Sequence, residues 1–200
     1  MAKPDKDTIK AYNAQADAYC GRFDRDTPDE QLTAFITGLP LSAHVLDLGC
    51  GTGRSSALMI EAGLSVDALD ATEAFVDMAR EQFGIEVRHA TFEDVTATDT
   101  YDGVYANFSL LHAPKVEMPG HLSRLWRALK DDGLLHVGLK TGTGEKRDKI
   151  GRFYSYYTDS EITGLLTDAG FRVDNRWFGS DKGLDGTVAP WLILHARKRS

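Results

Sequence analysis

Three features are scarce in this sequence: cysteine, blocks of basic residues and long apolar runs. The two cysteines, Cys20 and Cys50, lack the spacing of a metal site or a redox pair, so no structural disulfide is expected. A net charge of −7 argues against general binding to nucleic acid or acidic membranes. No segment is apolar over the length that spans a bilayer, and residues 1–10 lack the apolar core of a signal peptide. We therefore expect a cytoplasmic protein with no nucleic-acid or membrane partner.

Length and composition predict one globular domain. A chain of 200 residues is long enough to bury a full core, and 42% hydrophobic with 26% charged residues is ordinary for a globular protein. Two amphipathic helices are expected ahead of the main fold. We therefore predict a single domain over residues 1–200, with a helical cap at 1–40 and a core at 41–200.

Local signals divide the chain into helices and strands. Thr27 is predicted as the N-cap of the second helix, with Pro28 as its first residue and Glu30 completing a capping box. Periodicity and capping predict helices near residues 5–19, 28–39, 54–62, 73–83, 119–130 and 159–169, and strands at 45–48, 65–69, 85–89, 102–107, 134–139, 171–177 and 191–196. Residues 140–157 are predicted as a functional loop and residues 178–189 as an irregular connection.

The order of these elements predicts an α/β fold. Strands that alternate with helices indicate a parallel sheet covered on both faces. The last two strands have no helix between them, and a short connection permits an antiparallel hairpin. We predict a three-layer sandwich around a mostly parallel, seven-stranded sheet whose last strand is antiparallel.

Residues 44–54 are the stretch around which the chain is organised. An apolar run breaks into Gly49, Gly51 and Gly53 just before a helix begins. Glycines in such a strand–turn–helix unit let the backbone turn tightly and approach a ligand closely. Asp70 ends the next strand, where an acid typically bonds ribose hydroxyls. The pattern predicts a nucleoside cofactor.

The same stretch argues against a dinucleotide. A dinucleotide site favours a third glycine at the position that Arg54 occupies. Asp47 carries a negative charge just before the turn, which is poorly matched to a pyrophosphate but suits an amine or a sulfonium. The electrostatics favour a cationic nucleoside, and an NAD-dependent oxidoreductase is kept as a competing interpretation.

At Val45-Leu46-Asp47-Leu48-Gly49-Cys50-Gly51-Thr52-Gly53 and at Asp70, the chain resembles the class I S-adenosylmethionine-dependent methyltransferases. Residues 12–19, 129–133 and 169–171 support the resemblance. The match to the small-molecule branch, including the tellurite-resistance type, is looser. The resemblance implies a Rossmann-like fold, S-adenosyl-L-methionine as cofactor and a methyltransferase activity.

The resemblance also implies which residues hold the cofactor. Asp47 is expected near the methionine amino group, Asp70 at the ribose hydroxyls and Asn107 at the methionine end. The whole predicted set is Asp47, Gly49, Cys50, Gly51, Gly53, Asp70, Ala71, Thr72, Phe92, Glu93 and Asn107, with Tyr12, Tyr19 and Arg22 closing over the cofactor. For Tyr12, Tyr19 and Phe92, packing in the core is the alternative.

Methyl transfer by in-line displacement needs alignment and exclusion of water, so no metal is expected. His112 is the candidate base, because imidazole titrates near neutrality; a packing role is the alternative. Tyr154, Tyr157 and Arg152 are candidate substrate residues. Together with Lys140, Lys146, Arg147 and Lys149, Arg152 makes its loop basic, which suits either an anionic small substrate or a solvated loop.

These observations predict S-adenosylmethionine-dependent methyl transfer to a small-molecule acceptor. A non-catalytic sensor of S-adenosylmethionine or S-adenosylhomocysteine is the alternative, because function resides in the acceptor site rather than in the fold.

Overall fold

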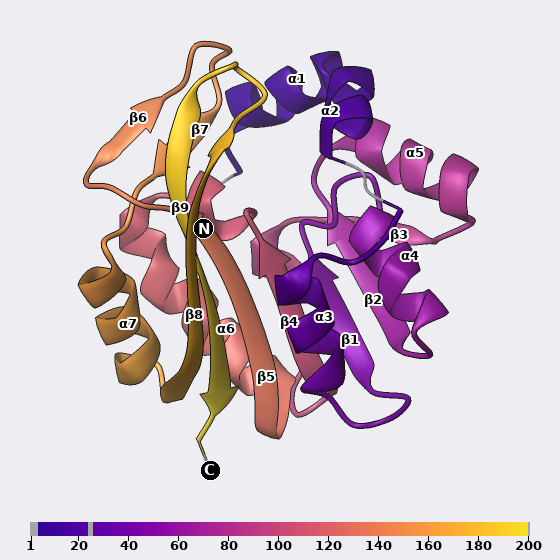
Figure 1. Cartoon of the computed structure of the whole chain (residues 1–200), viewed down its shortest axis with the longest axis vertical. Helices are drawn as coiled ribbons and strands as arrows, with labels where there is room; N and C mark the ends of the chain where they lie inside the picture. Colours follow the sequence, from indigo (N-terminus) through magenta and orange to yellow (C-terminus); the bar gives the residue numbers. More distant parts are fainter. Residues whose placement is uncertain (1–3, 24–25, 200) are drawn as a thin grey trace.

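Strands and helices alternate through the chain, as the sequence predicts (Figure 1). The computed structural model describes residues 4–23 and 26–199. The helices are α1 (Lys6–Ala14), α2 (Ala16–Phe23), α3 (Glu30–Thr37), α4 (Arg54–Glu61), α5 (Glu73–Phe83), α6 (Met118–Ala128) and α7 (Asp159–Asp168), with short 3-10 helices η1 (Phe92–Asp94), η2 (Leu110–His112) and η3 (Lys115–Glu117). The strands are β1 (His44–Leu48), β2 (Ser65–Asp70), β3 (Val87–His89), β4 (Tyr101–Asn107), β5 (Leu129–Lys140), β6 (Glu145–Arg147), β7 (Phe153–Ser155), β8 (Phe171–Lys182) and β9 (Val188–Lys198).

Seven of the strands form one sheet in the order β3-β2-β1-β4-β5-β9-β8. The pairs among β1 to β5 are parallel, whereas β9 is antiparallel to both β5 and β8. The short connection before β9 causes this reversal, because a parallel crossover needs about a dozen residues or more. The predicted seven-stranded, mostly parallel sheet with an antiparallel last strand is therefore confirmed.

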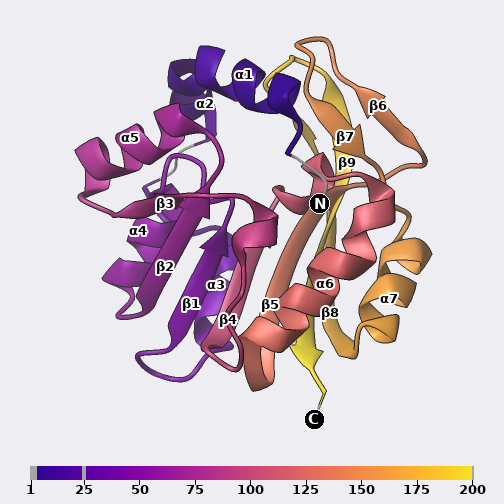
Figure 2. The same cartoon turned by 180° about the vertical axis from the view of Figure 1, so that it is seen from behind.

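Helices cover both faces of the sheet (Figures 1 and 2). On one face, α3 and α4 bury Phe35 and Met59 against Tyr105 of β4. On the other face, Leu122 of α6 and Leu166 of α7 belong to a larger apolar cluster with the strands. Burial on both faces explains why the central strands are almost continuously apolar. The predicted three-layer, Rossmann-like sandwich is confirmed.

The two N-terminal helices lie across the carboxyl ends of the strands (Figures 1 and 2). Of the cap expected at residues 1–40, α1 and α2 take this position, whereas α3 packs on the sheet. In the described part of the chain, no helix combines the length and the apolar character that crossing a membrane requires.

Two predictions for the N-terminal helices are wrong in detail. The helix expected over residues 5–19 is interrupted at Gln15, which is the C-cap of α1. Helix α3, the predicted second helix, is capped by Asp29 and not by Thr27. The Asp29 carboxylate accepts a hydrogen bond from the Leu32 N–H at 2.8 Å. A carboxylate both caps the free N–H groups and favours the positive end of the helix dipole.

Strand β5 begins earlier than the predicted strand. Leu129 pairs with Tyr101, and residues 130–133 bulge out before Leu134 pairs with Gly103. The chain does turn at residues 130–133, as the sequence predicts. This turn is a bulge within β5 and does not lie between a helix and a strand.

Two irregular segments expected from the sequence are partly strand. Residues 140–157 contain the antiparallel hairpin of β6 and β7, and β8 and β9 reduce the connection expected at 178–189 to residues 183–187. Pairing with a neighbouring strand stabilises these additional strand residues. The local sequence does not show which strands pair, so it does not predict these residues as strand.

Candidate functional site

The glycine turn after β1 is folded around the end of β2. The N–H groups of Gly49 and Cys50 both donate to the Leu69 carbonyl, at 2.9 and 3.0 Å. The Gly51 N–H donates to Asp70 Oδ2 at 2.9 Å, and the Thr72 N–H donates to Asp70 Oδ1 at 2.8 Å. Asp70 thus ties the turn to the start of α5. Its burial raises the pKa of the Asp70 carboxyl, while these N–H groups favour the carboxylate.

The three glycines of the turn, all with positive φ, serve different purposes. A Cβ on Gly49 would lie 2.5 Å from Ser109 Cβ, and one on Gly53 would lie 2.7 Å from Ala79 Cβ. A Cβ on Gly51 would meet only the Tyr19 ring, at 3.7 Å. Gly53 therefore allows close packing of α5, whereas Gly51 faces open space.

Asp47 is almost fully buried behind the turn, where its Oδ2 accepts a 2.6 Å hydrogen bond from the Ser56 hydroxyl. Burial, with a contribution from the charge of Asp70, raises the pKa of Asp47 to about 7. The side chain lines no described cavity.

One cavity opens beside the glycine turn; we call it the glycine-turn cavity. Of the predicted residues, it brings together Gly49, Gly51, Asp70, Ala71, Thr72, Phe92, Glu93, Asn107, His112, Tyr12 and Tyr19. Four carboxylates line it, those of Asp5, Asp70, Glu93 and Glu117, and no lysine or arginine among the described residues does so. The cavity favours a cationic ligand.

Sequence reasoning missed several residues of this cavity. Phe75 of α5 lines it, although its helical spacing predicts only packing. Ser109 also lines it, and the buried Ser109 hydroxyl has no hydrogen-bond partner among the described residues. An unsatisfied buried hydroxyl at a cavity wall is suited to a polar ligand atom. No local signal identifies it, because the loop after β4 brings it there.

A second cavity lies between the β8–β9 turn, the end of β5 and the first turns of α3 and α4. We call it the hairpin cavity, after the hairpin of β8 and β9. The predicted residues Cys50, Arg22, Arg152 and Tyr154 line it. Tyr157 lines neither cavity, because it is buried in the larger apolar cluster with Lys115 over its ring. Asp47 and Gly53 are the other two predicted site residues that the structure does not bring to a cavity wall.

The two cavities meet at a junction formed by Tyr12, Tyr19, Asn107 and Phe108, which line both. Phe108 has a φ of 54°, a left-handed conformation that is uncommon for an aromatic residue. Such strain concentrates at functional sites.

A buried chain of hydrogen bonds orients Asn107 at this junction. His136 Nε2 donates to the Asn107 amide oxygen at 3.1 Å, and His195 Nε2 lies 3.0 Å from Nδ1 of His136. Since the amide oxygen only accepts, His136 carries its proton on Nε2, and its Nδ1 accepts from His195. Burial lowers the pKa of both imidazoles, to about 4 for His195, which keeps them neutral.

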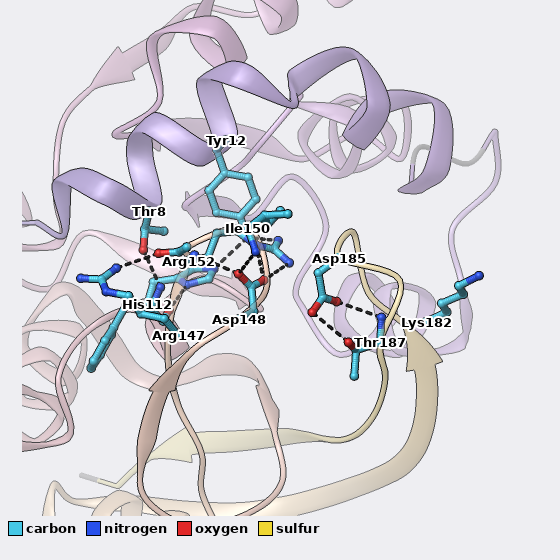
Figure 3. Close-up of polar contacts among 12 residues, drawn as sticks. Thr8, Tyr12, His112, Arg147, Asp148, Ile150, Arg152, Lys182, Asp185 and Thr187 are labelled. Atoms are coloured by element: carbon cyan, nitrogen blue, oxygen red, sulfur yellow. Dashed lines mark hydrogen bonds and ion pairs between the residues drawn. The ribbon is translucent and has the colours of Figure 1, made fainter.

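A second chain of hydrogen bonds reaches the junction from the β6–β7 hairpin (Figure 3). His112 Nδ1 donates to the Phe153 carbonyl at 2.6 Å, so its Nε2 accepts from the Tyr12 hydroxyl at 2.8 Å. Arg152 Nη1 donates to the Tyr12 oxygen at 3.0 Å, and Asp148 pairs with Arg152 at 2.8 Å. Burial, with the nearby positive charge of Arg152, lowers the pKa of His112 to about 3.

Helix α1 is also fastened to this hairpin at its start (Figure 3). The Arg147 guanidinium makes two hydrogen bonds to the Asp5 carboxylate, at 2.7 and 2.9 Å, and the Phe153 N–H donates to the Thr8 hydroxyl at 2.8 Å. The hydrogen bond to Arg147 lowers the pKa of Asp5 well below its usual range. Helix α1 thus lines both cavities through Tyr12, and the segment that ends in β7 lines the hairpin cavity through Arg152 and Tyr154.

Residues 45–133 match the family model described as a methyltransferase domain. The match covers the glycine turn, Asp70 and the central strands, on a sheet with the predicted topology. Residues 45–133 of the chain are therefore similar to a methyltransferase domain. This similarity agrees with the cationic nucleoside that the glycine spacing and Asp47 favour over a dinucleotide.

Similar proteins include two methyltransferases. The chain is 28% identical over 161 residues to trans-aconitate 2-methyltransferase of Deinococcus radiodurans. The aligned region covers 74% of this chain and 61% of that protein. It is 26% identical over 127 residues to an uncharacterized methyltransferase of Staphylococcus carnosus, covering 62% of this chain and 59% of that one. The chain thus spans about three-fifths of the length of these relatives.

The same fold occurs in 1,6-didemethyltoxoflavin-N1-methyltransferase of Burkholderia thailandensis. The TM-score is 0.76 at 21% identity, over 100% of this chain and 92% of that chain. That structure contains 1,6-didemethyltoxoflavin and S-adenosylhomocysteine. At this identity the likeness demonstrates a shared fold.

Proposed function

We propose that this protein transfers a methyl group from S-adenosylmethionine, bound in the glycine-turn cavity, to a small molecule bound in the hairpin cavity. When bound, S-adenosylmethionine supplies an electrophilic methyl group on a sulfonium that leaves as a neutral thioether. The chain itself then has to hold both molecules in line and keep water out.

The acidic lining of the glycine-turn cavity is the observation that carries this proposal. Arg147 offsets the charge of Asp5, but the carboxylates of Asp70, Glu93 and Glu117 pair with no lysine or arginine of the described residues. These three attract a cationic sulfonium and repel a pyrophosphate. The Asp70 carboxylate has lone pairs left for ribose hydroxyls after it accepts from Gly51 and Thr72. The free hydroxyl of Ser109 offers a further hydrogen bond.

The proposed cofactor residues form two groups: residues on the cavity wall that contact the cofactor, and residues behind the wall that act without contact. Gly51, Asp70 and the rings of Phe75 and Phe92 bind directly from the cavity wall. Asp47 acts from behind the turn through its charge, and Gly53 acts through the packing of α5.

The junction of the two cavities is where the acceptor atom meets the methyl group. Asn107 has its amide oxygen held by His136, and its NH2 group has no partner among the described residues. That group can therefore donate to the acceptor or to the cofactor. Tyr12 and Tyr19 cover the junction and exclude water.

His112 acts here as a positioning residue. Its two ring nitrogens hold Tyr12 and Phe153, and an imidazole with a pKa of about 3 is a weak base at neutral pH. A role as general base would require release of the Tyr12 hydroxyl first. The base predicted from the sequence is therefore a second proposal, which the pH dependence in the Discussion tests.

Two relatives support a small acceptor, since their names specify trans-aconitate and a toxoflavin precursor as substrates of those proteins. Within the hairpin cavity, Arg152 and Tyr154 are the proposed substrate residues, and Tyr157 lies outside it in the larger apolar cluster.

Calorimetry with S-adenosylmethionine, S-adenosylhomocysteine and NAD tests the cofactor. We expect the first two to bind and NAD not to; binding of NAD alone would overturn the proposal. Asp70→Asn should weaken S-adenosylmethionine binding by about 10- to 100-fold, since a hydrogen bond to a charged group contributes about 1.5–3 kcal/mol. Asp67→Asn on the same strand, outside both cavities, is the matched control and should bind normally.

Transfer of a labelled methyl group to pooled cell metabolites separates an enzyme from a sensor. We expect a labelled small molecule that is absent with Asp70→Asn. Cofactor binding without any transfer would favour the sensor.

A further inference from the structure

The hairpin cavity has the opposite charge to the glycine-turn cavity. Among the described residues, five cationic side chains line it but only two carboxylates, those of Asp29 and Asp181. The cationic residues are Arg22, Arg54, Lys140, Arg152 and Lys182. In a chain with a net charge of −7, this concentration of positive charge at one cavity is a local reversal of sign.

Several of these charges already have partners. Arg152 pairs with Asp148 at 2.8 Å, Arg54 lies 3.6 Å from Asp26, and Asp181 accepts from the indole N–H of Trp191 at 2.7 Å. Of the basic residues in the 140–157 loop, Arg147 pairs with Asp5 away from the cavity. Carboxylates therefore offset the charges of Arg54, Arg147 and Arg152.

Lys140 differs from them. Its ammonium is half-buried over the Tyr154 ring, 3.9 Å from the ring centroid, and no carboxylate oxygen of the described residues lies within 4 Å of it. Burial and the nearby Arg152 lower the pKa of Lys140, and the more distant carboxylates of Asp185 and Asp148 only partly offset this. An ammonium that is partly desolvated and has no carboxylate at ion-pair distance gains stability from an incoming anion.

The position of Lys140 sets a distance to the reacting atom. Asn107 pairs with Gly138 across β4 and β5, and Lys140 lies two residues further along β5. Two residues of a strand span about 7 Å. An anionic group bound at Lys140 is therefore only a few bonds from an acceptor atom at the junction.

From these contacts we infer that the acceptor of this methyltransferase is a small anion, whose carboxylate or phosphate group pairs with the Lys140 ammonium. This inference rests on the proposed function. Arg152 contributes mainly by holding Tyr12 in place, and the apolar walls of Tyr154 and Trp191 cover the rest of the ligand.

Anion binding can be measured directly on the protein saturated with S-adenosylhomocysteine. Calorimetry with citrate and with inorganic phosphate at constant ionic strength should detect binding of at least one. We expect Lys140→Met to weaken it about tenfold or more and Lys140→Arg to retain it. Lys146→Met, a matched change on the outer hairpin, should bind as the wild type does. The probe that binds more tightly indicates whether the natural ligand carries a carboxylate or a phosphate group.

Methyl transfer provides a second readout. With small carboxylic acids and sugar phosphates, each paired with its neutral amide or free sugar, we expect labelling of an anion and not of its neutral partner. Lys140→Met should raise KM for that anion about tenfold with kcat little changed. The inference is overturned if neither probe anion binds, if Lys140→Met binds normally, or if neutral partners are methylated equally well. A protein that binds no S-adenosylmethionine would instead overturn the proposed function.

Discussion

The Tyr12 hydroxyl lies 2.8 Å from Nε2 of His112, although the two residues are 100 positions apart. Tyr12 belongs to α1 and His112 to η2, so this bond fastens the N-terminal helix to the loop that follows β4. Both side chains line the glycine-turn cavity. A cofactor bound there is enclosed as long as the helix stays fastened.

Tyr12→Phe tests this fastening. The variant loses the donor to His112 and the acceptor for Arg152 but keeps the ring, so we expect S-adenosylmethionine to bind about 3- to 10-fold more weakly, with the change mainly in the dissociation rate. Stopped-flow measurement of release gives that rate. Tyr156→Phe, outside both cavities, should release the cofactor at the wild-type rate; equal rates for both variants would contradict the enclosure.

The pH dependence of turnover distinguishes the two roles of His112. Because the pKa of His112 is lowered to about 3, the imidazole is neutral throughout pH 5–9. We therefore expect kcat to show no limb near pH 6–7 that depends on this residue. His112→Gln should raise KM for S-adenosylmethionine more than it lowers kcat. An acidic limb that disappears in this variant would instead establish His112 as a base.

The glycine turn predicts a contrast between two alanine variants. Gly53→Ala places a Cβ 2.7 Å from Ala79 at positive φ, so the free energy of unfolding should fall by about 2–5 kcal/mol. Gly51→Ala meets only the Tyr19 ring, so it should lose about 1–2 kcal/mol of stability but bind S-adenosylmethionine more than about tenfold more weakly. Denaturant titration and calorimetry measure the two effects. The reverse order would show that Gly51 does not face the cofactor.

Asp47 makes folding depend on pH. Its pKa is raised to about 7, so the folded protein binds a proton that the unfolded chain releases near pH 4. Stability from this group is therefore present below pH 4 and is lost as the pH rises to 7, by up to about 4 kcal/mol. Asp47→Asn should raise Tm relative to the wild type at pH 8 and not at pH 4.

The same substitution should weaken cofactor binding, because it removes the negative charge behind the turn. Calorimetry at pH 8 measures this cost; undiminished affinity would contradict a role for the Asp47 charge.

Chelation tests whether a metal takes part. Glu93, Glu117 and His121 have potential ligand atoms that all lie within 4.8 Å of one another, and the two glutamates line the glycine-turn cavity. An in-line displacement that depends on alignment needs no metal, so we expect methyl transfer to be unchanged after dialysis against EDTA. Loss of activity that Zn²⁺ or Mn²⁺ restores would contradict this, and His121→Ala would then identify the site.

The fold was predictable because its signals are local. The strands around the glycine turn are buried on both faces and therefore read as short apolar runs, and Gly84 ends α5 in the left-handed conformation that its sequence position suggests. Where two local signals compete, as Thr27 and Asp29 do, the sequence does not decide between them.

The cavities were only partly predictable. Their walls depend on contacts between distant residues, such as the approach of Ser109 to Gly49 and of Tyr12 to His112. The basic loop reads as one cluster in the sequence, yet the β6–β7 hairpin sends Arg147 to Asp5 and only part of the loop to the cavity. Pairing across a hairpin determines these directions, and composition carries no record of it.

Because β9 returns antiparallel to β8, the turn between them lies apart from the glycine turn. The turn at residues 183–187 forms one wall of the hairpin cavity and no wall of the glycine-turn cavity. Insertions or deletions in that turn can reshape the acceptor pocket without moving Gly51 or Asp70. Changes confined to this turn can therefore alter which acceptor the proposed enzyme takes, while the residues proposed to hold the methyl donor stay in place.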